Sequence, residues 1–128
     1  MLAVLQGVLN VTNNLQSPSP YIINFPFGNP TLNAMSVFFD PFFQALNIGS
    51  AITLPANPSY AICVLNLSTT ANLSVQFTPV GNPATIVQVG PGGIVIPVFD
   101  PNKAGPGVSS LLLTGIGGTV PAMVLAAA

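Results

Sequence analysis

The sequence predicts an all-β protein, an antiparallel β-sandwich or jelly roll of about eight to ten short strands. Fourteen Pro and twelve Gly residues interrupt the chain every few positions and leave few stretches long enough for a helix. Val, Ile, Thr and Phe fill the stretches between them, and these residues favour strands. At 128 residues, half of them hydrophobic, the chain has the size and apolar content of one domain with its own core.

The expected strands follow one another along the whole chain, each bounded by Pro, Gly, Asn or Ser. They cover residues 3–11, 21–27, 33–39, 51–54, 61–67, 73–79, 85–89, 93–99, 109–114 and 122–126. Apolar and polar residues alternate in residues 73–78, which indicates one buried and one polar face of an antiparallel sheet. The Pro- and Gly-containing residues 79–83 predict a hairpin connection, and glycine-rich turns are expected at residues 90–93 and 115–118.

The N-terminal region defines the expected domain organisation. Residues 1–20 are predicted to form a strand and a polar linker, and residues 21–128 a single β-sandwich domain. We interpret the first strand as an arm that adds to a neighbour's sheet, because exposed strand edges accept further strands. No Lys or Arg precedes the apolar start, so no signal peptide is expected. No run approaches the ~18 apolar residues of a membrane helix, so no membrane span is expected.

Three segments are apolar on both faces of the expected strand: residues 94–99, 111–113 and 123–125. One face of such a strand packs on the core, and the other face needs a cover. That cover is either a partner protein or a loop or arm of the same chain, and the sequence leaves both alternatives open. Pro97 lacks a backbone donor, which indicates an edge strand or a bulge at this position.

Four of the eight Phe residues lie within residues 38–43, the densest aromatic cluster of the chain. Three interpretations are open: a core cluster, an anchor between subunits, and a platform for sugar stacking. The step from Asp40 to Pro41 predicts a turn, and Pro at the first position favours a short helical turn over residues 40–46. The candidate interface joins these aromatic residues to the two-sided strands and comprises Phe38, Phe39, Phe42, Phe43, Ile94, Ile96, Val98, Met123 and Leu125.

The charge content is the most unusual property of the chain. Asp40, Asp100 and Lys103 are its only charged side chains, 2% of the residues against roughly 25% in ordinary soluble domains. Without His, Glu or Arg the chain has few groups for acid–base catalysis or metal binding, so no enzymatic activity, metal or cofactor is expected. One Lys neutralises too few phosphates for a nucleic-acid partner. A net charge near zero gives little repulsion between copies, which favours assembly.

Two further local predictions concern Cys63 and the loop at residues 100–107. Cys63 lies in an apolar run and is expected to be a small buried hydrophobic residue, since no His or Arg is available to activate its thiol. The Pro- and Gly-rich loop carries two of the three charges and is expected to be a solvated turn. Asp100 and Lys103 are expected to form a weak ion pair in it, worth less than ~1 kcal/mol when exposed.

The second half of the chain has a recognisable succession of elements. The alternating strand 73–78 is followed by Pro-x-Gly, by a second strand that runs into the glycines of 90–93, and by the apolar strand 94–99. A Pro/Gly loop, the strand 109–114 and a closing strand 120–126 complete it. From about residue 61 onward this pattern resembles the small β-sandwich head decoration or cement proteins of tailed bacteriophages. The resemblance implies a protein bound to the outside of a capsid, as dimers or trimers that clamp neighbouring capsomers. The chain departs from that family in having far fewer charges.

These observations together predict a non-enzymatic structural protein of a viral particle, located on the capsid surface of the virion. The expected partners are the major capsid protein, copies of the chain itself in a homo-oligomer, or both. The first alternative is a subunit of a microbial filament or surface layer outside the cell, assembled by β-strand exchange. The second is a carbohydrate-binding β-sandwich module, which predicts an exposed row of aromatic residues.

Overall fold

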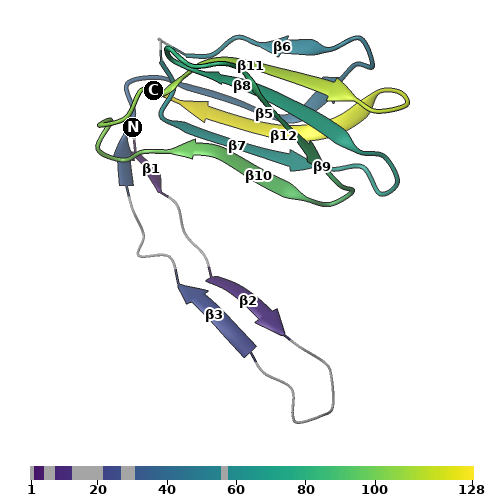
Figure 1. Ribbon diagram of the computed structural model, residues 1–128, viewed down its shortest axis with the longest axis horizontal. Helices are drawn as coiled ribbons and strands as arrows, with labels where there is room; N and C mark the ends of the chain where they lie inside the picture. Colours follow the sequence, from purple (N-terminus) through teal and green to yellow (C-terminus); the bar gives the residue numbers. More distant parts are fainter. Residues whose placement is uncertain (1, 5–7, 13–21, 27–30, 56–57) are drawn as a thin grey trace.

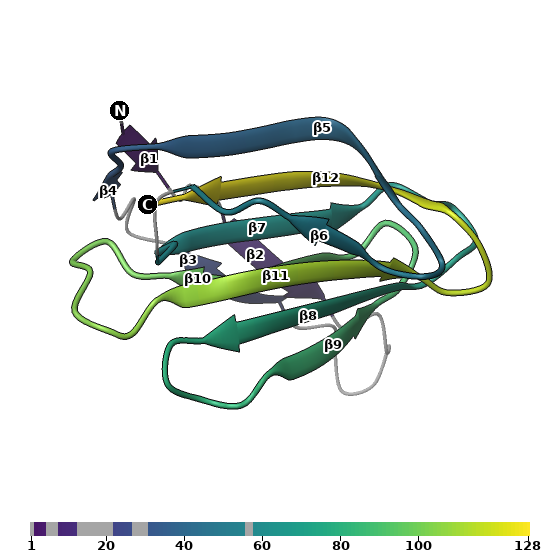
Figure 2. The ribbon, with the colours of Figure 1, turned by 90° about the horizontal axis from the view of Figure 1, so that it is seen from above.

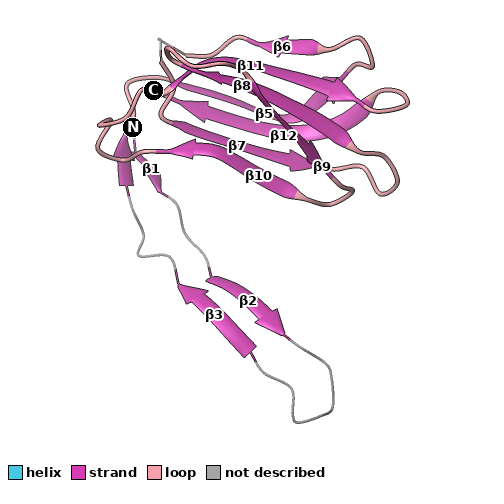
Figure 3. Ribbon diagram, viewed as in Figure 1, coloured by secondary structure: helices cyan, strands magenta, loops and turns pink. Residues whose placement is uncertain are grey.

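A computed structural model describes residues 2–4, 8–12, 22–26, 31–55 and 58–128 of the chain. These residues form twelve strands and no helix, so the predicted all-β class is confirmed (Figure 3). None of them belongs to a helix long and apolar enough to cross a membrane. Eight of the strands build two facing sheets, and the four N-terminal strands form two separate pairs (Figure 1).

The two four-stranded sheets are antiparallel throughout and form the sandwich. Sheet 1 has the order β10-β7-β12-β5, and sheet 2 has the order β6-β11-β8-β9. The strands of sheet 1 are β10 (Ile94–Phe99), β7 (Ala61–Asn66), β12 (Val120–Ala127) and β5 (Val37–Ala45). The strands of sheet 2 are β6 (Ser50–Ile52), β11 (Val108–Gly115), β8 (Leu73–Pro79) and β9 (Thr85–Val89).

The connections between these strands follow a jelly-roll path. From β5 to β12 the chain passes from one sheet to the other at every step except the β8–β9 hairpin, which stays within sheet 2 (Figure 2). The first and last of these strands, β5 and β12, lie side by side in sheet 1. Of the two predicted alternatives, a simple sandwich or a jelly roll, the strand order is that of the jelly roll.

The N-terminal strands lie outside both sandwich sheets. β1 (Leu2–Val4) pairs with β4 (Thr31–Asn33), and β2 (Val8–Thr12) pairs with β3 (Ile22–Pro26). Figure 1 shows the β2–β3 ribbon extending away from the sandwich on the side of β10. Residues 21–27 were expected to open the sandwich domain, but β3 pairs with β2 instead, and the sandwich begins at β5. The expected linker after Thr12 lies outside the described residues.

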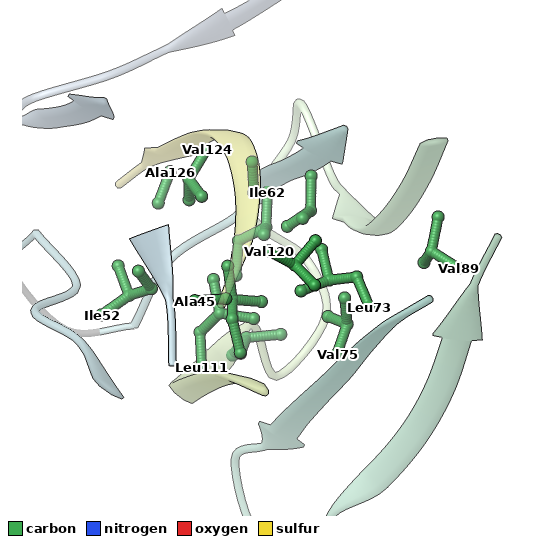
Figure 4. Close-up of a cluster of buried hydrophobic side chains, with 14 residues drawn as sticks. Ala45, Ile52, Ile62, Leu73, Val75, Val89, Leu111, Val120, Val124 and Ala126 are labelled. Atoms are coloured by element: carbon green, nitrogen blue, oxygen red, sulfur yellow. The ribbon is translucent and has the colours of Figure 1, made fainter. Parts of the chain in front are cut away.

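The core lies between the two sheets and is made of aliphatic side chains (Figure 4). The alternation predicted for β8 is confirmed, because Leu73 and Val75 are fully buried and Phe77 packs against the same cluster. The buried members of the cluster are Ala45, Ile52, Ile62, Val64, Leu73, Val75, Val89, Val108, Leu111, Leu113, Val120, Ala122, Val124 and Ala126. Burial of this apolar surface is the main source of the free energy of folding.

Two of the three prolines within strands of sheet 1, Pro41 and Pro97, lie on edge strands next to irregular pairing. The register of β10 shifts between Val95 and Val98, so the prediction that Pro97 marks an edge or a bulge is confirmed. The helical turn expected at residues 40–46 is wrong, since β5 continues through Pro41 as a strand up to Ala45. Its pairing with β12 shifts at Pro41, where an edge strand tolerates the missing N–H donor.

The predicted glycine turns are also present. Gly93 N–H donates to the Gly90 carbonyl between β9 and β10, at 2.9 Å. Between β11 and β12, a Cβ atom on Gly115 would collide with the carbonyl oxygens of Gly118 and Ala45. Gly117 in the same turn has a φ of +84°, a conformation that favours glycine. The glycines therefore allow the last two strands to reverse direction tightly against β5.

Candidate functional site

The outer side of sheet 1 carries a first row of apolar residues across its strands. Residues that oppose each other in antiparallel neighbours lie on the same face of the sheet. Leu65 of β7 is opposite Ile94 on one side and opposite Met123 of β12 on the other. Phe42 lies at the irregular pairing of β5, beside Met123. The row thus runs across all four strands without a charged residue.

A second row lies two residues further along the same strands. Cys63 of β7 is opposite Leu125 of β12, and Leu125 is opposite Phe39 of β5. Ile96 of β10 lies at the register shift next to Cys63. All four residues are apolar, and they continue the first row along the sheet.

Together the two rows form what we call the apolar face, and several of its members are strongly exposed. Phe42 is 81% exposed, Ile94 60%, Phe39 55% and Ile96 39%, whereas the residues of the two central strands are half-buried by their neighbours. A contiguous exposed patch of this kind marks an interaction site more often than isolated surface residues do. The apolar face consists of Phe39, Phe42, Cys63, Leu65, Ile94, Ile96, Met123 and Leu125.

One end of this side of sheet 1 is already covered by the N-terminal segment. Leu32 and Ala34 are buried against Ala61 and Ala127, in the next row beyond Leu125. Backbone hydrogen bonds between Ser36 and Ala128 hold the segment to the end of the chain. The expected cover by an arm of the same chain is therefore present at this end. Among the described residues it does not reach the apolar face.

The structure brings together six of the nine residues predicted as the interface. Phe39, Phe42, Ile94, Ile96, Met123 and Leu125 all belong to the apolar face. Phe38, Phe43 and Val98 instead point to the other side of sheet 1 and pack against the core cluster. Phe38 is opposite Ala126 and Phe43 is opposite Ala122, so each small residue leaves room for a ring. The aromatic cluster is thus divided between core and surface.

The outer side of sheet 2 is polar by comparison. Ser74 of β8 is opposite Thr114 and Gln88, and Thr78 is opposite Ser110. The apolar residues on this side are fewer: Leu112 is half-buried beside Ala51, and Ile86 is exposed beside Gln76. The polar groups here are hydroxyls and amides, with no formal charge.

The two carboxylates serve local backbone turns. Asp40 accepts a hydrogen bond from the Phe42 backbone N–H at 2.9 Å, and Asp100 accepts one from the Gly105 N–H at 2.6 Å. Asp40 lies on β5 and Asp100 follows β10, and these are the two opposite edges of sheet 1. Three strand spacings separate the edges, roughly 14 Å, which exceeds the carboxylate spacing of glycosidases. In the described part of the chain no three His, Cys, Asp or Glu residues gather as metal ligands.

The single Lys lies over an aromatic ring. Lys103 Nζ is 5.9 Å from the centre of the Tyr60 ring, within range of a cation–π interaction. The weak ion pair expected between Asp100 and Lys103 is wrong, because the Asp100 carboxylate binds the Gly105 N–H and the ammonium lies over Tyr60. Lys103 has a φ of +53°, an unusual left-handed conformation for a non-glycine residue, which sets its direction in the loop.

Cys63 lies on the apolar face and not in the core. The prediction of a small buried hydrophobic residue is correct in that the neighbours of Cys63 are apolar. It is wrong in the degree of burial, because Cys63 is only half-buried. Burial raises the pKa of the Cys63 thiol above its ordinary value, because desolvation disfavours the thiolate. The thiol therefore remains protonated at neutral pH and behaves as an apolar contact residue.

Asn66 is an important buried residue that the sequence analysis missed. Its side-chain Nδ2 donates to the carbonyls of Ala71, Val89 and Gly90 at 2.8 to 3.1 Å. Its Oδ1 accepts from the Ser68 N–H at 2.9 Å. Asn66 is fully buried at the end of β7 in sheet 1, and Val89 ends β9 in sheet 2, so this amide links the two sheets. A lone Asn in an Asn-rich chain gave no signal of this role.

The apolar face is the clearest chemical difference between the two sides of the sandwich. Its only ionisable group is the Cys63 thiol, so it provides contact surface and little scope for proton transfer. Comparisons with models of protein families, with curated proteins and with solved structures find no match, so its role is inferred from this geometry.

Proposed function

We propose that this chain is a non-enzymatic structural subunit of a viral particle, a decoration or cement protein on the capsid surface. Its apolar face binds protein: the major capsid protein, further copies of the chain, or both. The alternative subunit of a microbial filament or surface layer uses the same uncharged contacts but forms open-ended polymers.

The observation that carries this proposal is the apolar face itself. Phe42 and Ile94 are more than half exposed, and the two rows of residues to which they belong carry no charge. A subunit whose apolar side is covered in its particle avoids that exposure, whereas a free monomer does not. The outer side of sheet 2 is polar, so it is suited to remain exposed to water in the particle.

The fold supports the proposal by analogy. Jelly rolls are frequent in viral capsid proteins and in lectins, and the strand order of this chain is of that type. A fold hosts many functions, so the site must distinguish between them. A sugar site combines a stacking ring with converging polar groups, whereas the cross-strand neighbours of Phe39 and Phe42 on β12 are Leu125 and Met123. The surroundings therefore favour protein contact over sugar binding.

The proposal that the chain has no enzymatic activity rests on the distribution of its ionisable groups. The carboxylates lie at opposite edges of sheet 1 and bind backbone amides, and Lys103 lies over Tyr60. Acid–base catalysis requires such groups to converge on one substrate. Their separation gives a surface suited to binding by shape.

The direct test is to locate the chain on a particle. An antibody raised against the purified protein is used with gold label to image particles from the culture that produces the chain. Label over the outer surface of closed, icosahedral particles is the expected result. Label along filaments or on a cell envelope would support the alternative instead. Absence of label from every particle, although the protein is present in the sample, would refute both.

A further inference from the structure

We infer that the β2–β3 ribbon of one copy docks on the apolar face of a second copy, so that neighbouring subunits are joined by exchanged arms. This inference rests on the proposed function, since it names the partner of the surface that the function requires. It identifies the occupant of the apolar face as a segment of the same polypeptide.

The ribbon has one apolar and one more polar face. Its register pairs Leu9 with Phe25 and Val11 with Ile23, while Asn10 pairs with Asn24 at the alternate position. Residues alternate between the two faces of a strand, so the first four residues share one face. The other face holds the two Asn residues together with Val8, Thr12, Ile22 and Pro26. The ribbon carries no charged residue. Its apolar side therefore matches an uncharged surface.

The ribbon also needs a surface to pack on. A single two-stranded ribbon is marginally stable by itself in water and gains stability when it packs on another layer. Figure 1 shows β2 and β3 clear of both sandwich sheets of their own chain. Within the described part of the chain, β2 and β3 pair only with each other and join neither sandwich sheet.

The apolar face continues an interface that the same N-terminal segment already makes. Leu32 of β4 and Ala34 just beyond it are buried over Ala61 and Ala127, directly next to the row that contains Leu125. Sheet 1 thus accepts this segment as a further layer on its outer side. A ribbon from another copy, packed beyond Leu32, extends that layer over the exposed residues.

A second copy is the occupant favoured by the direction of the ribbon. β1 and β4 at the base are paired with each other, and Leu32 is fully buried, which fixes the base on the covered end of sheet 1. From this base the ribbon extends away from its own sandwich, past β10 (Figure 1). Exchange of an identical element between copies needs no surface beyond those present in each chain.

The native cysteine provides a direct test. Cys63 lies on the apolar face and is the only cysteine of the chain. One protein carries Cys63→Ser together with a new cysteine on the ribbon, at Leu9 or Phe25 in separate variants (Leu9→Cys, Phe25→Cys). It is mixed with the wild-type protein, oxidised with diamide and analysed by non-reducing electrophoresis and mass spectrometry. A disulfide between the ribbon cysteine and Cys63 of the wild-type chain is the expected product.

Matched variants on the other side of the ribbon are the control. Asn10→Cys and Asn24→Cys, in the same Cys63→Ser background, should give at least about tenfold less of the mixed disulfide. Circular dichroism of every variant confirms that the sandwich is folded. Equal cross-linking from both sides of the ribbon would indicate random collision and would overturn the inference.

A further variant separates exchange from folding back. Leu9→Cys with Cys63 retained is oxidised alone at low protein concentration. A disulfide within one chain, without the mixed product in the first experiment, would show that the ribbon covers its own sheet and would overturn the inference. Sedimentation velocity of the wild type distinguishes this failure from failure of the proposed function. Assembly without ribbon cross-links rejects only the arm exchange, whereas a monomer at all concentrations counts against both.

Discussion

The two sheets of the sandwich share one core but differ on their outer sides. On sheet 2, Ser74, Gln76 and Thr78 alternate with buried residues of the same strand, so that the outer side is polar. On sheet 1, the corresponding positions are apolar, as Met123 and Leu125 show for β12. Hydrophobic burial in the core requires only one apolar side per sheet. The second apolar side is therefore unnecessary for folding the sandwich and indicates a contact outside it.

The two sheets are joined by the side-chain amide of Asn66, and we expect the largest loss of stability when this amide is removed. Asn66→Ala leaves the carbonyls of Ala71, Val89 and Gly90 without their donor and should lower the free energy of unfolding by about 2–4 kcal/mol. Urea denaturation measures the change. Asn72→Ala, at an exposed position nearby, is the control and should change it by less than about 0.5 kcal/mol. Equal effects would show that Asn66 does not link the sheets.

Replacing the most exposed apolar residues of sheet 1 by polar ones should strongly weaken assembly. The double variant Phe42→Ser and Ile94→Ser removes the two most exposed residues of the apolar face, and self-association should weaken about 100-fold. Sedimentation velocity over a concentration series measures this. Ile86→Ser removes an equally exposed apolar residue, 63% accessible, from sheet 2 and should leave association unchanged. If Ile86→Ser disrupts assembly as strongly, the distinction between the two sides fails.

The reactivity of a thiol can probe the difference between the outer sides of the two sheets. The raised pKa of Cys63 and its cover in the assembly should make it react several-fold more slowly with a water-soluble disulfide at pH 8 than a cysteine on sheet 2. Ser74→Cys in a Cys63→Ala background, also half-buried, provides that comparison. A Cys63 thiol that reacts as fast as the one at position 74 would show that the apolar face is open to solvent.

The direction of the pKa shift also predicts how stability depends on pH. Because the pKa of the Cys63 thiol is raised in the folded protein, its contribution to stability is constant at pH values below the ordinary value of 9.0. The contribution declines as pH rises beyond that value. Urea denaturation between pH 7 and 10 should show this decline, and Cys63→Ala should reduce it. An identical pH profile in the variant would show that Cys63 is not its source.

The smallest effect is expected from salt and moderate pH. Contacts without charged groups are not screened, so the dissociation constant of the assembly should change less than about threefold between 0.05 and 1 M NaCl. The same holds between about pH 5 and 8.5, since hardly any side chain titrates in that interval. Light scattering measures both series. A steep loss of assembly with salt would point to Asp40, Asp100 or Lys103 as contact residues and away from the apolar face.

Much of the fold was accessible from the sequence because local patterns govern it. Alternation in β8, the hairpin after Pro79 and the position of Pro97 all follow from backbone geometry within a few residues. The sequence of β12 also showed that both faces of this strand are apolar, which indicated an apolar surface in addition to the core. The division of the aromatic cluster was not, because the irregular pairing at Pro41 shifts the alternation along β5.

The amino-acid sequence is enough to conclude that this chain is all-β, almost free of charge and too apolar for its core to bury every apolar residue. Which of these residues share the remaining apolar surface depends on the tertiary structure. Phe39 and Ile96 lie on opposite edges of sheet 1 and belong to one face only because β7 and β12 pair between them. Asn66 likewise acquires its role from carbonyls 23 and 24 residues away. Long-range pairing of strands brings such residues together, and local sequence patterns do not encode it.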